Sequence, residues 1–283
     1  MFLFYTGLVN STLPSSDFYY IALGEGRYQP TIHTQGAWSA LEQHMAPVGG
    51  LLTHALERHA PRPEMQLGRV TFDILGMIPA QISSITTQTL RPGRTIELIE
   101  ATMSVGDRVV VRATAWRLSI QDTQEVAASE AAALPAPDEC PPWGGMGRWG
   151  GGYIESVEFR AVPGSRPGAG AAWLQTPYGL VGGEESTALA RFVGLVDTAN
   201  GIGPRQGPEA WVFPNTDLSI HFFRAPELPW VGLSAQASWG ATGLGLTTTT
   251  LYDVHGPVGQ ASQVLTIRPQ PTKSQPAEPH NQA

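Results

Sequence analysis

Three side chains that could perform hydrolytic chemistry alternate along one short segment. Asp217, Ser219 and His221 lie two residues apart, so a strand would point all three toward the same face. Carboxylate, hydroxyl and imidazole are the groups of a serine-hydrolase triad, but neighbours on one strand rarely supply the hydrogen-bond geometry that a triad needs. The chain also lacks the Gly-x-Ser-x-Gly turn that exposes such a serine. This segment therefore does not predict a serine hydrolase.

The residue types that bind metals and cofactors are present without the spacing that those groups need. His44, His54 and His59 lie near the first predicted helix, but they do not form a cluster on one face with carboxylates. The glycines around position 243 do not follow the Gly-x-Gly-x-x-Gly pattern of a dinucleotide site. Cys140 is the only cysteine, so the chain cannot form an intramolecular disulfide. We expect no metal, no cofactor and a reducing, cytoplasmic location.

The elements that would position any site occur twice. Val48-Gly49-Gly50 recurs as Val181-Gly182-Gly183, and the segment 69–79 can be laid over 216–226. Each copy has strand pattern, one apolar helix and about four alternating strands, which predicts an α+β fold with a sheet around each central helix. The expected helices span residues 49–59 and 184–198. The expected strands span 18–33, 69–78, 81–90, 94–104 and 108–118, and then 153–162, 216–224, 230–239, 242–252 and 257–267.

The boundaries follow from changes in composition. Residues 125–139 are rich in Ala, Pro and acidic residues, residues 143–152 are rich in Gly, and the chain after Arg268 is rich in Pro, Gln and Ser. We expect an N-terminal unit over residues 1–120, a linker over 121–150, a C-terminal unit over 151–270 and a disordered tail over 271–283.

The second copy resembles a known family. The string from Asp217 to Pro226, followed by Trp230, Leu251-Tyr-Asp-Val-His-Gly256 and Ala261-Ser-Gln263, resembles the double-hotdog acyl-CoA thioesterases, and most of all bacterial acyl-CoA thioesterase II. The similarity covers most of residues 15–268. It implies a double hotdog, that is, two tandem hotdog units, each a long central helix wrapped by an antiparallel sheet. It also implies a role in lipid metabolism, with acyl-CoA as the substrate and free acid and CoA as the products.

The resemblance also implies a catalytic set. In that family a carboxylate, a hydroxyl residue and a glutamine orient a water that attacks the thioester carbonyl, and these roles fall on Asp217, Ser238 and Gln263. Asp217 would accept the water proton, and the other two side chains would fix the water by hydrogen bonds. When the two copies are aligned, Val70 of the first copy takes the position of Asp217, and roughly Ala115 takes the position of Gln263. We therefore expect one active site per chain, in the second half.

Several alternatives stay open at this stage. Backbone N–H groups at a helix start could bind the oxyanion, and Gly49, Gly50, Gly182 and Gly183 are the candidates. Asp197, near the end of the second helix, is the alternative carboxylate, and its other interpretation is a helix cap. A different class of function is an acyl or acyl-CoA binding protein that keeps the hotdog tunnel without catalysis.

Charge and hydropathy restrict the partners. The chain of 283 residues has a formal net charge of −7, and it has no basic stripe with interleaved aromatic residues, so we expect no nucleic acid partner. No run approaches the roughly 20 apolar residues of a membrane helix, so we expect no membrane insertion. Two fused hotdog units already satisfy the pairing of single hotdogs, which leaves a monomer and a homo-oligomer both open.

Overall fold

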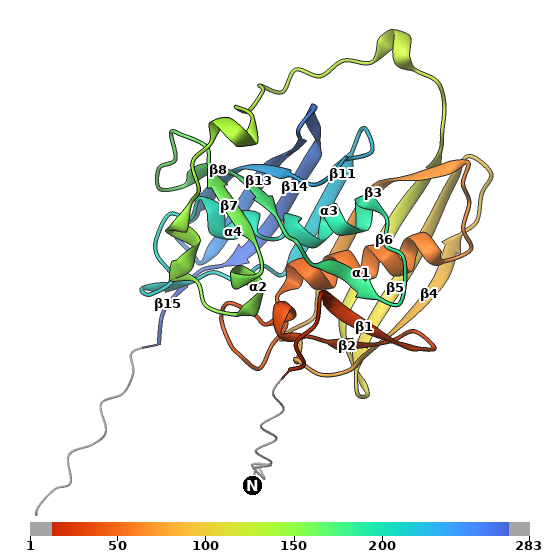
Figure 1. Ribbon diagram of the computed structural model, residues 1–283, viewed down its shortest axis with the longest axis horizontal. Coiled ribbons are helices and arrows are strands. Elements are labelled where there is room, and N and C mark those ends of the chain that lie inside the picture. Colours follow the sequence, from red (N-terminus) through yellow and green to blue (C-terminus); the bar gives the residue numbers. More distant parts are fainter. Residues whose placement is uncertain (1–12, 272–283) are drawn as a thin grey trace, which may run out of the picture.

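The computed structural model describes residues 13–271, and its largest feature is one thirteen-stranded sheet (Figure 1). The expected disordered tail lies outside the described residues from residue 272 onward. The strands of this sheet are β1 (Phe18–Gly24), β2 (Arg27–Pro30), β3 (Met65–Ile74), β4 (Ser83–Arg91), β5 (Ile96–Val105), β6 (Arg108–Ser119), β7 (Glu158–Ala161), β8 (Ala169–Gln175), β9 (Gly179–Gly182), β11 (Asp217–Phe222), β12 (Val231–Trp239), β13 (Leu244–Asp253) and β14 (Gly256–Thr266). A separate pair joins β10 (Trp211–Val212) to β15 (Arg268–Pro269).

The helices are few. They are α1 (Met45–Arg58), α2 (Gly152–Glu155), α3 (Ala188–Val196) and α4 (Ala199–Ile202), with short 3-10 turns at Ile32–Thr34, Gln124–Val126, Pro137–Glu139 and Gly144–Arg148. In the part of the chain that the structure describes, no helix is long and apolar enough to cross a membrane.

The sheet contains the same strand order twice. The first half runs β3-β6-β5-β4-β2-β1 and the second half runs β11-β14-β13-β12-β8-β7. The halves join where β3 and β11 pair antiparallel, with Phe72 opposite Leu218. At the far edge β9 leaves the second half and pairs in parallel with β1 of the first, with Val181 beside Tyr20. Each half is therefore built on one long helix and a mainly antiparallel sheet, and the two halves interlock.

The two long helices lie against each other at the centre, with the sheet curving around them (Figure 1). Every residue of α1 from Met45 to Leu56 is buried, which is typical of a helix enclosed by its own domain. The contact with α3 requires glycine, because a Cβ on Gly50 would lie 2.9 Å from the Cα of Gly194. The closest approach of the two helices thus depends on two residues without side chains.

Three expectations about the elements need correction. The second helix begins at Ala188 and not at Glu184, because Gly183 adopts a positive φ of 88° in a turn and Thr187 caps the helix through a bond from Ala190 N–H. The segment 153–162 begins with the short helix α2 before β7. The two Val-Gly-Gly copies are not equivalent, since one lies inside α1 and the other in β9 and the following turn.

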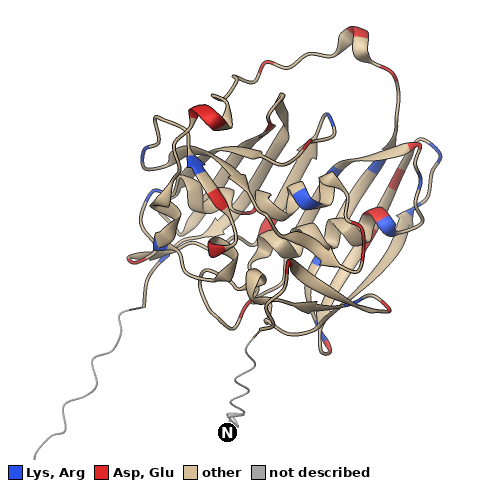
Figure 2. Cartoon of the chain, viewed as in Figure 1, with Lys and Arg blue, Asp and Glu red and all other residues tan. Residues whose placement is uncertain are grey.

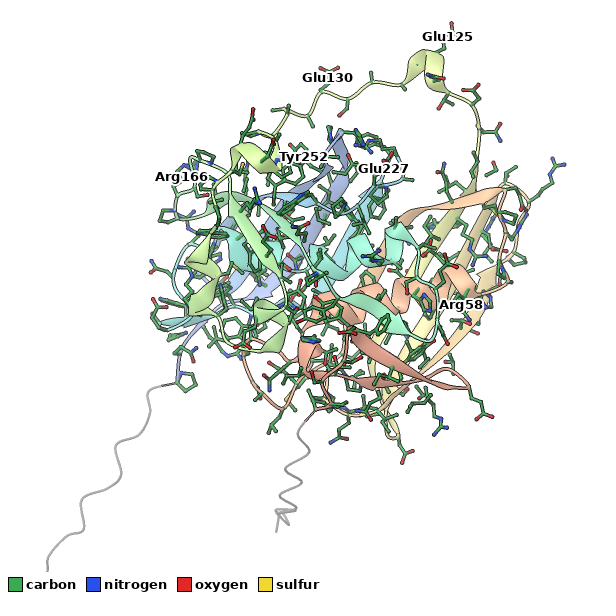
Figure 3. All side chains as sticks on the ribbon, in the orientation of Figure 1. Arg58, Glu125, Glu130, Arg166, Glu227 and Tyr252 are labelled. Carbon is green, nitrogen blue, oxygen red and sulfur yellow. The ribbon has the colours of Figure 1, made fainter. Side chains whose placement is uncertain are left out.

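The connection between the halves has two parts of different character. Residues 120–133, which include Glu125 and Glu130, arch over the body of the molecule (Figure 3). Cys140 and Trp149, by contrast, are buried against the second half and the core. Charged residues are scattered over the ribbon, with both signs interspersed (Figure 2). The tryptophan-bearing part of the predicted linker thus helps to form the wall of the second half.

Candidate active site

The second long helix ends in a buried carboxylate. Asp197 follows the last residue of α3, where the chain turns into α4, and only 6% of its surface is exposed. Phe192 and Val196 pack the apolar face of α3 into the core, and this packing fixes residue 197. A carboxylate at a helix C-terminus faces the negative end of the helix dipole, so both burial and location make its charge costly. Such costs are concentrated at functional sites.

Two amide side chains hold one oxygen of this carboxylate. Asn215 Nδ2 and Gln263 Nε2 each donate to Asp197 Oδ1, and both distances are 2.7 Å. Asn215 lies two residues before β11, in an isolated bridge with Leu265, and its Nδ2 also donates to the main-chain oxygen of Asp217 at 3.0 Å. Gln263 projects from the buried face of β14. Because both side-chain amides donate their hydrogen bonds to Oδ1, Oδ2 is the carboxylate oxygen left to take a proton.

The surroundings tune the basicity of Asp197. Burial raises its pKa from 3.8 to about 6, and the hydrogen bonds from Asn215 and Gln263 oppose this rise. A base works best when its pKa lies close to the working pH, because it must be ionised and still bind a proton well. Asp197 is therefore ionised at neutral pH and more basic than an aspartate in water.

The start of α1 approaches the same carboxylate from the first half. His44 is the N-cap of α1, and its Nδ1 accepts the N–H of Ala46 at 3.1 Å and lies 3.8 Å from Asp197 Oδ2. Its ring stacks on Tyr153 with centroids 4.2 Å apart. Burial lowers the pKa of His44 to about 3, so the imidazole is neutral at neutral pH. It shapes the site beside Asp197 without adding a charge.

The first turn of α1 also offers a backbone donor that has no partner among residues 13–271. The N–H of His44 bonds to Thr34 O, the N–H of Ala46 bonds to the His44 ring, and Pro47 has no N–H. Among the first four backbone positions of the helix this leaves the N–H of Met45, which has no partner within the helix. Met45 lines the same cavity as Asp197. A single uncommitted donor at a helix N-terminus is suited to a developing negative charge.

Asp197 lies where two cavities meet. A wide cavity of about 350 Å³ and a narrow cavity of about 50 Å³ share Trp38, His44, Asp197 and Asn215 in their walls. The wide cavity continues past Met45, Ile78 and Arg268. The narrow cavity continues past Met146, Trp149 and Gly201. Among residues 13–271 no group of three or more His, Cys, Asp or Glu side chains is arranged to hold a metal.

The structure separates the three residues expected to form the catalytic set. Strand residues alternate between faces, and Gln263 lies on the buried face of β14 with Ala261 and Leu265. Asp217 and Ser238 lie on the opposite, outer face of the sheet: Asp217 Oδ1 accepts the N–H of Val264 at 2.7 Å, and Ser238 is exposed on β12. The structure therefore does not bring Asp217 and Ser238 together with Gln263, and the carboxylate that Gln263 contacts is Asp197.

The four glycines expected to bind an oxyanion do not lie at the start of a helix. Gly49 and Gly50 are the fifth and sixth residues of α1, so their N–H groups belong to the internal bonds of the helix. Gly182 lies in β9 beside Ile21 of β1, and Gly183 lies in the turn well before α3 begins. None of the four stands at the start of a helix, and their role in this structure is close packing and turning.

Three residues of this site are not identified by the sequence: Asn215, His44 and Met45. Asn215 stands two residues before Asp217, and it is Asn215, not Asp217, whose side chain contacts Asp197. The available signal is the Pro-Asn pair just before the strand, because Pro and Asn are depleted inside strands and mark the point where β11 begins. His44 was considered only as a metal ligand, and nothing in its spacing identifies it as the helix cap that contacts Asp197.

The opposite ends of the helix pair lack this arrangement. There α1 ends near Arg58 (Figure 3), and Arg117 of β6, the strand that corresponds to β14, donates to the carbonyls of Leu56, His59 and Ala60. Arg117 also pairs with Glu97 at 3.1 Å. A guanidinium thus satisfies the C-terminus of α1, whereas the C-terminus of α3 carries Asp197. The two ends have the same topology and different chemistry.

The fold is that of the hotdog scaffold, and family models of the sequence identify the family. The model of the acyl-CoA thioesterase N-terminal domain matches residues 34–118, and the model of the acyl-CoA thioesterase C-terminal domain matches residues 137–267. The chain belongs to the acyl-CoA thioesterase family and is a thioester hydrolase. No curated protein sequence gives a significant match.

Solved structures show the same fold at low identity. A conserved protein of unknown function with a hot dog fold from Alicyclobacillus acidocaldarius superposes with a TM-score of 0.69 at 14% identity, covering 87% of this chain and 95% of the other. The acyl-CoA thioesterase II TesB2 of Mycobacterium marinum gives 0.63 at 16% identity, with 92% and 98% covered. A tesB protein of Mycobacterium avium subspecies paratuberculosis gives 0.63 at 16% identity, with 88% and 96% covered.

Proposed function

We propose that this protein hydrolyses acyl-CoA thioesters to free acid and CoA with a water that Asp197 activates. The observation that supports this most is the carboxylate itself, buried, held by two amides at 2.7 Å and placed where two cavities meet. A thioester needs no strong acid for its leaving group, because a thiolate leaves readily, so a positioned base and a donor for the oxyanion suffice.

The reaction then proceeds in two steps. Asp197 Oδ2 takes a proton from the water while the water oxygen attacks the thioester carbonyl carbon. The Met45 N–H donates to the resulting oxyanion. The tetrahedral intermediate collapses, the C–S bond breaks, and the sulfur leaves with the proton that Asp197 received. Gln263 Oε1 is buried without a hydrogen-bond partner among the described residues, so it is suited to accept the second hydrogen of the water.

The wide cavity suits the pantetheine arm of CoA. The nucleotide of CoA must stay outside the protein, so its arm has to leave through the cavity with more room. Arg268 lines this cavity and provides a cation for the phosphates. Hydrolysis of acyl-CoA would place the protein in lipid metabolism, and a single free, buried cysteine suits a reducing cytoplasm.

The same proposal includes the division of the chain. We propose that an N-terminal hotdog unit lies within residues 1–120, of which the structure describes 13–120, and that a C-terminal unit lies within residues 151–270. Residues 121–150 would join the two units into a double hotdog. The C-terminal unit contributes Asp197, Asn215 and Gln263, and the N-terminal unit completes the site with His44 and Met45. At the C-terminus of α1, Arg117 stands in place of a second buried carboxylate, and this supports one active site per chain.

The test is release of free thiol from a panel of short, medium and long acyl-CoA substrates. We expect turnover of some member and a loss of at least about 100-fold in kcat for Asp197→Asn, the contribution typical of a general base. Asp217→Asn is the matched control, since an Asn oxygen can still accept the Val264 N–H, and it should retain activity. Tight acyl-CoA binding without turnover would instead support a binding protein, although a carrier has no use for a carboxylate buried at such cost.

A further inference from the structure

The narrow cavity beside Asp197 has a size and a chemistry that restrict the acyl group. Its volume of about 50 Å³ holds on the order of four groups of the size of a water molecule, each of which needs roughly 10–15 Å³ of such space. If CoA leaves through the wide cavity, the acyl group must enter the narrow one. Only a short chain of a few carbons fits there.

One wall of this cavity carries an unused hydrogen-bond donor. Trp149 is 7% exposed, and its Nε1 has no partner among residues 13–271. The indole packs edge-on against Trp38 and Phe213, with centroids 5.0 and 5.6 Å away, so these rings restrict its orientation. Its nitrogen faces Gly201, where an added Cβ would lie 3.4 Å from Nε1, and Gly201 lines the cavity too.

A buried donor without an acceptor is costly, and a ligand oxygen would remove that cost. A plain alkyl chain cannot do so, because it has no acceptor. We propose that the preferred acyl group is short and carries a hydroxy or oxo oxygen within its first four carbons, which accepts the Trp149 indole N–H. This inference rests on the proposed acyl-CoA hydrolysis and names the substrate class of that site.

The experiment compares kcat/KM for acetyl-, butyryl- and octanoyl-CoA with that for 2-, 3- and 4-hydroxybutyryl-CoA. We expect octanoyl-CoA to be at least about 10-fold worse than butyryl-CoA. At least one hydroxy isomer should exceed butyryl-CoA by about 5- to 150-fold, the range set by leaving a buried donor unpaired. In Trp149→Phe, which keeps a ring and removes the N–H, this ratio should fall to about one.

Trp239→Phe is the matched control. The Trp239 indole nitrogen is also buried without a partner in the described chain, and its ring also packs on Phe213, at 5.1 Å, but it does not line the narrow cavity. The hydroxy preference should survive in this variant. Gly201→Ala is an independent probe, because its methyl group would lie next to Trp149 Nε1, and it should lower hydroxybutyryl turnover more than acetyl turnover.

The outcomes separate the two proposals. Turnover of butyryl- and octanoyl-CoA without any hydroxy preference, or a preference that Trp149→Phe leaves intact, overturns the inference while acyl-CoA hydrolysis stands. Faster turnover of octanoyl- than butyryl-CoA overturns the assignment of the narrow cavity to the acyl group. Failure to hydrolyse any acyl-CoA overturns the proposed function, and the inference with it.

Discussion

Replacing Asp197 with asparagine should abolish activity and stabilise the protein at the same time. Burial raises the pKa of this carboxyl from 3.8 to about 6, so the folded state holds the proton more tightly than the unfolded state does. Between these two pH values the folded protein carries more protons, and the free energy of unfolding therefore falls as pH rises. Above pH 6 the full cost of the buried charge is present, and below pH 3.8 it is absent.

The magnitude follows from the shift. The difference between about 6 and 3.8 is roughly 2 units, and at about 1.4 kcal/mol per unit the ionised carboxylate costs about 3 kcal/mol of stability at pH 8. Asparagine keeps an oxygen for the amide hydrogens of Asn215 and Gln263 and carries no charge. At pH 8 the free energy of unfolding of Asp197→Asn should thus be about 3 kcal/mol higher than that of the wild type. This gain should disappear toward pH 4.

Urea unfolding of both proteins at several pH values measures this difference directly. An equal free energy of unfolding for the two proteins at pH 8, or a gain that grows as the pH falls, would refute the reasoning. The pH dependence of activity tests the same carboxyl group independently. At pH values below about 6, kcat/KM of the wild type should decrease, because the protonated carboxyl cannot act as a base. An activity that persists unchanged at pH 4 would place the base elsewhere.

Three further predictions test the rest of the site and its scaffold. Gln263→Leu removes a bond that lowers the pKa of Asp197, so the acidic limb of the pH profile of kcat/KM should move to higher pH, and an unmoved limb would contradict this. Met45→Pro removes the proposed oxyanion donor at a position where helices accept proline, and kcat should fall about 100-fold, whereas Met45→Leu, which keeps the N–H, should not show this loss. Gly50→Ala would place its Cβ 2.9 Å from the Cα of Gly194, which should cost about 1–3 kcal/mol in denaturant unfolding. Gly49→Ala, whose Cβ meets only ordinary contacts, should be neutral or stabilising by up to about 1 kcal/mol, and equal effects of the two would count against a close helix contact.

Much of the fold could be predicted because periodicity reports local structure. The strands around 108–118 and 257–267 and the helix before Pro61 follow from alternation and 3.6-residue spacing, and their observed bounds differ by a few residues. The helix predicted over 184–198 is too long at its N-terminus, because Glu184 and Glu185 look like the first turn of a helix. Glu184 instead accepts a bond from the buried His54 of α1, 130 residues earlier in the chain, at 2.8 Å. A contact of that separation leaves no local signal.

The candidate site was harder to predict because it depends on the face of each strand. Asp217 and Asn215 are two residues apart, yet Asp217 belongs to β11 and Asn215 forms an isolated bridge with Leu265 before that strand, and their side chains bond to different partners. Gln263 lies in the expected last strand, where its neighbours alternate clearly between buried and exposed positions. Ser238 was selected by resemblance, but alternation along β12 puts it on the outer face with Gln236.

The cost of a charge at position 197 is itself the reason to assign the chemistry there. A negative charge at a helix C-terminus is unfavourable, and that argument favours a structural cap over a base when only the sequence is considered. The structure adds burial to this cost and then limits it with two amide donors on one oxygen. At the matching end of α1 the chain uses Arg117, which is also buried but pairs with Glu97 and donates to the helix carbonyls, so its charge is compensated. A fold that needed only to end its helices could have used the same solution twice, so the uncompensated carboxylate supports the proposal that Asp197 is the base.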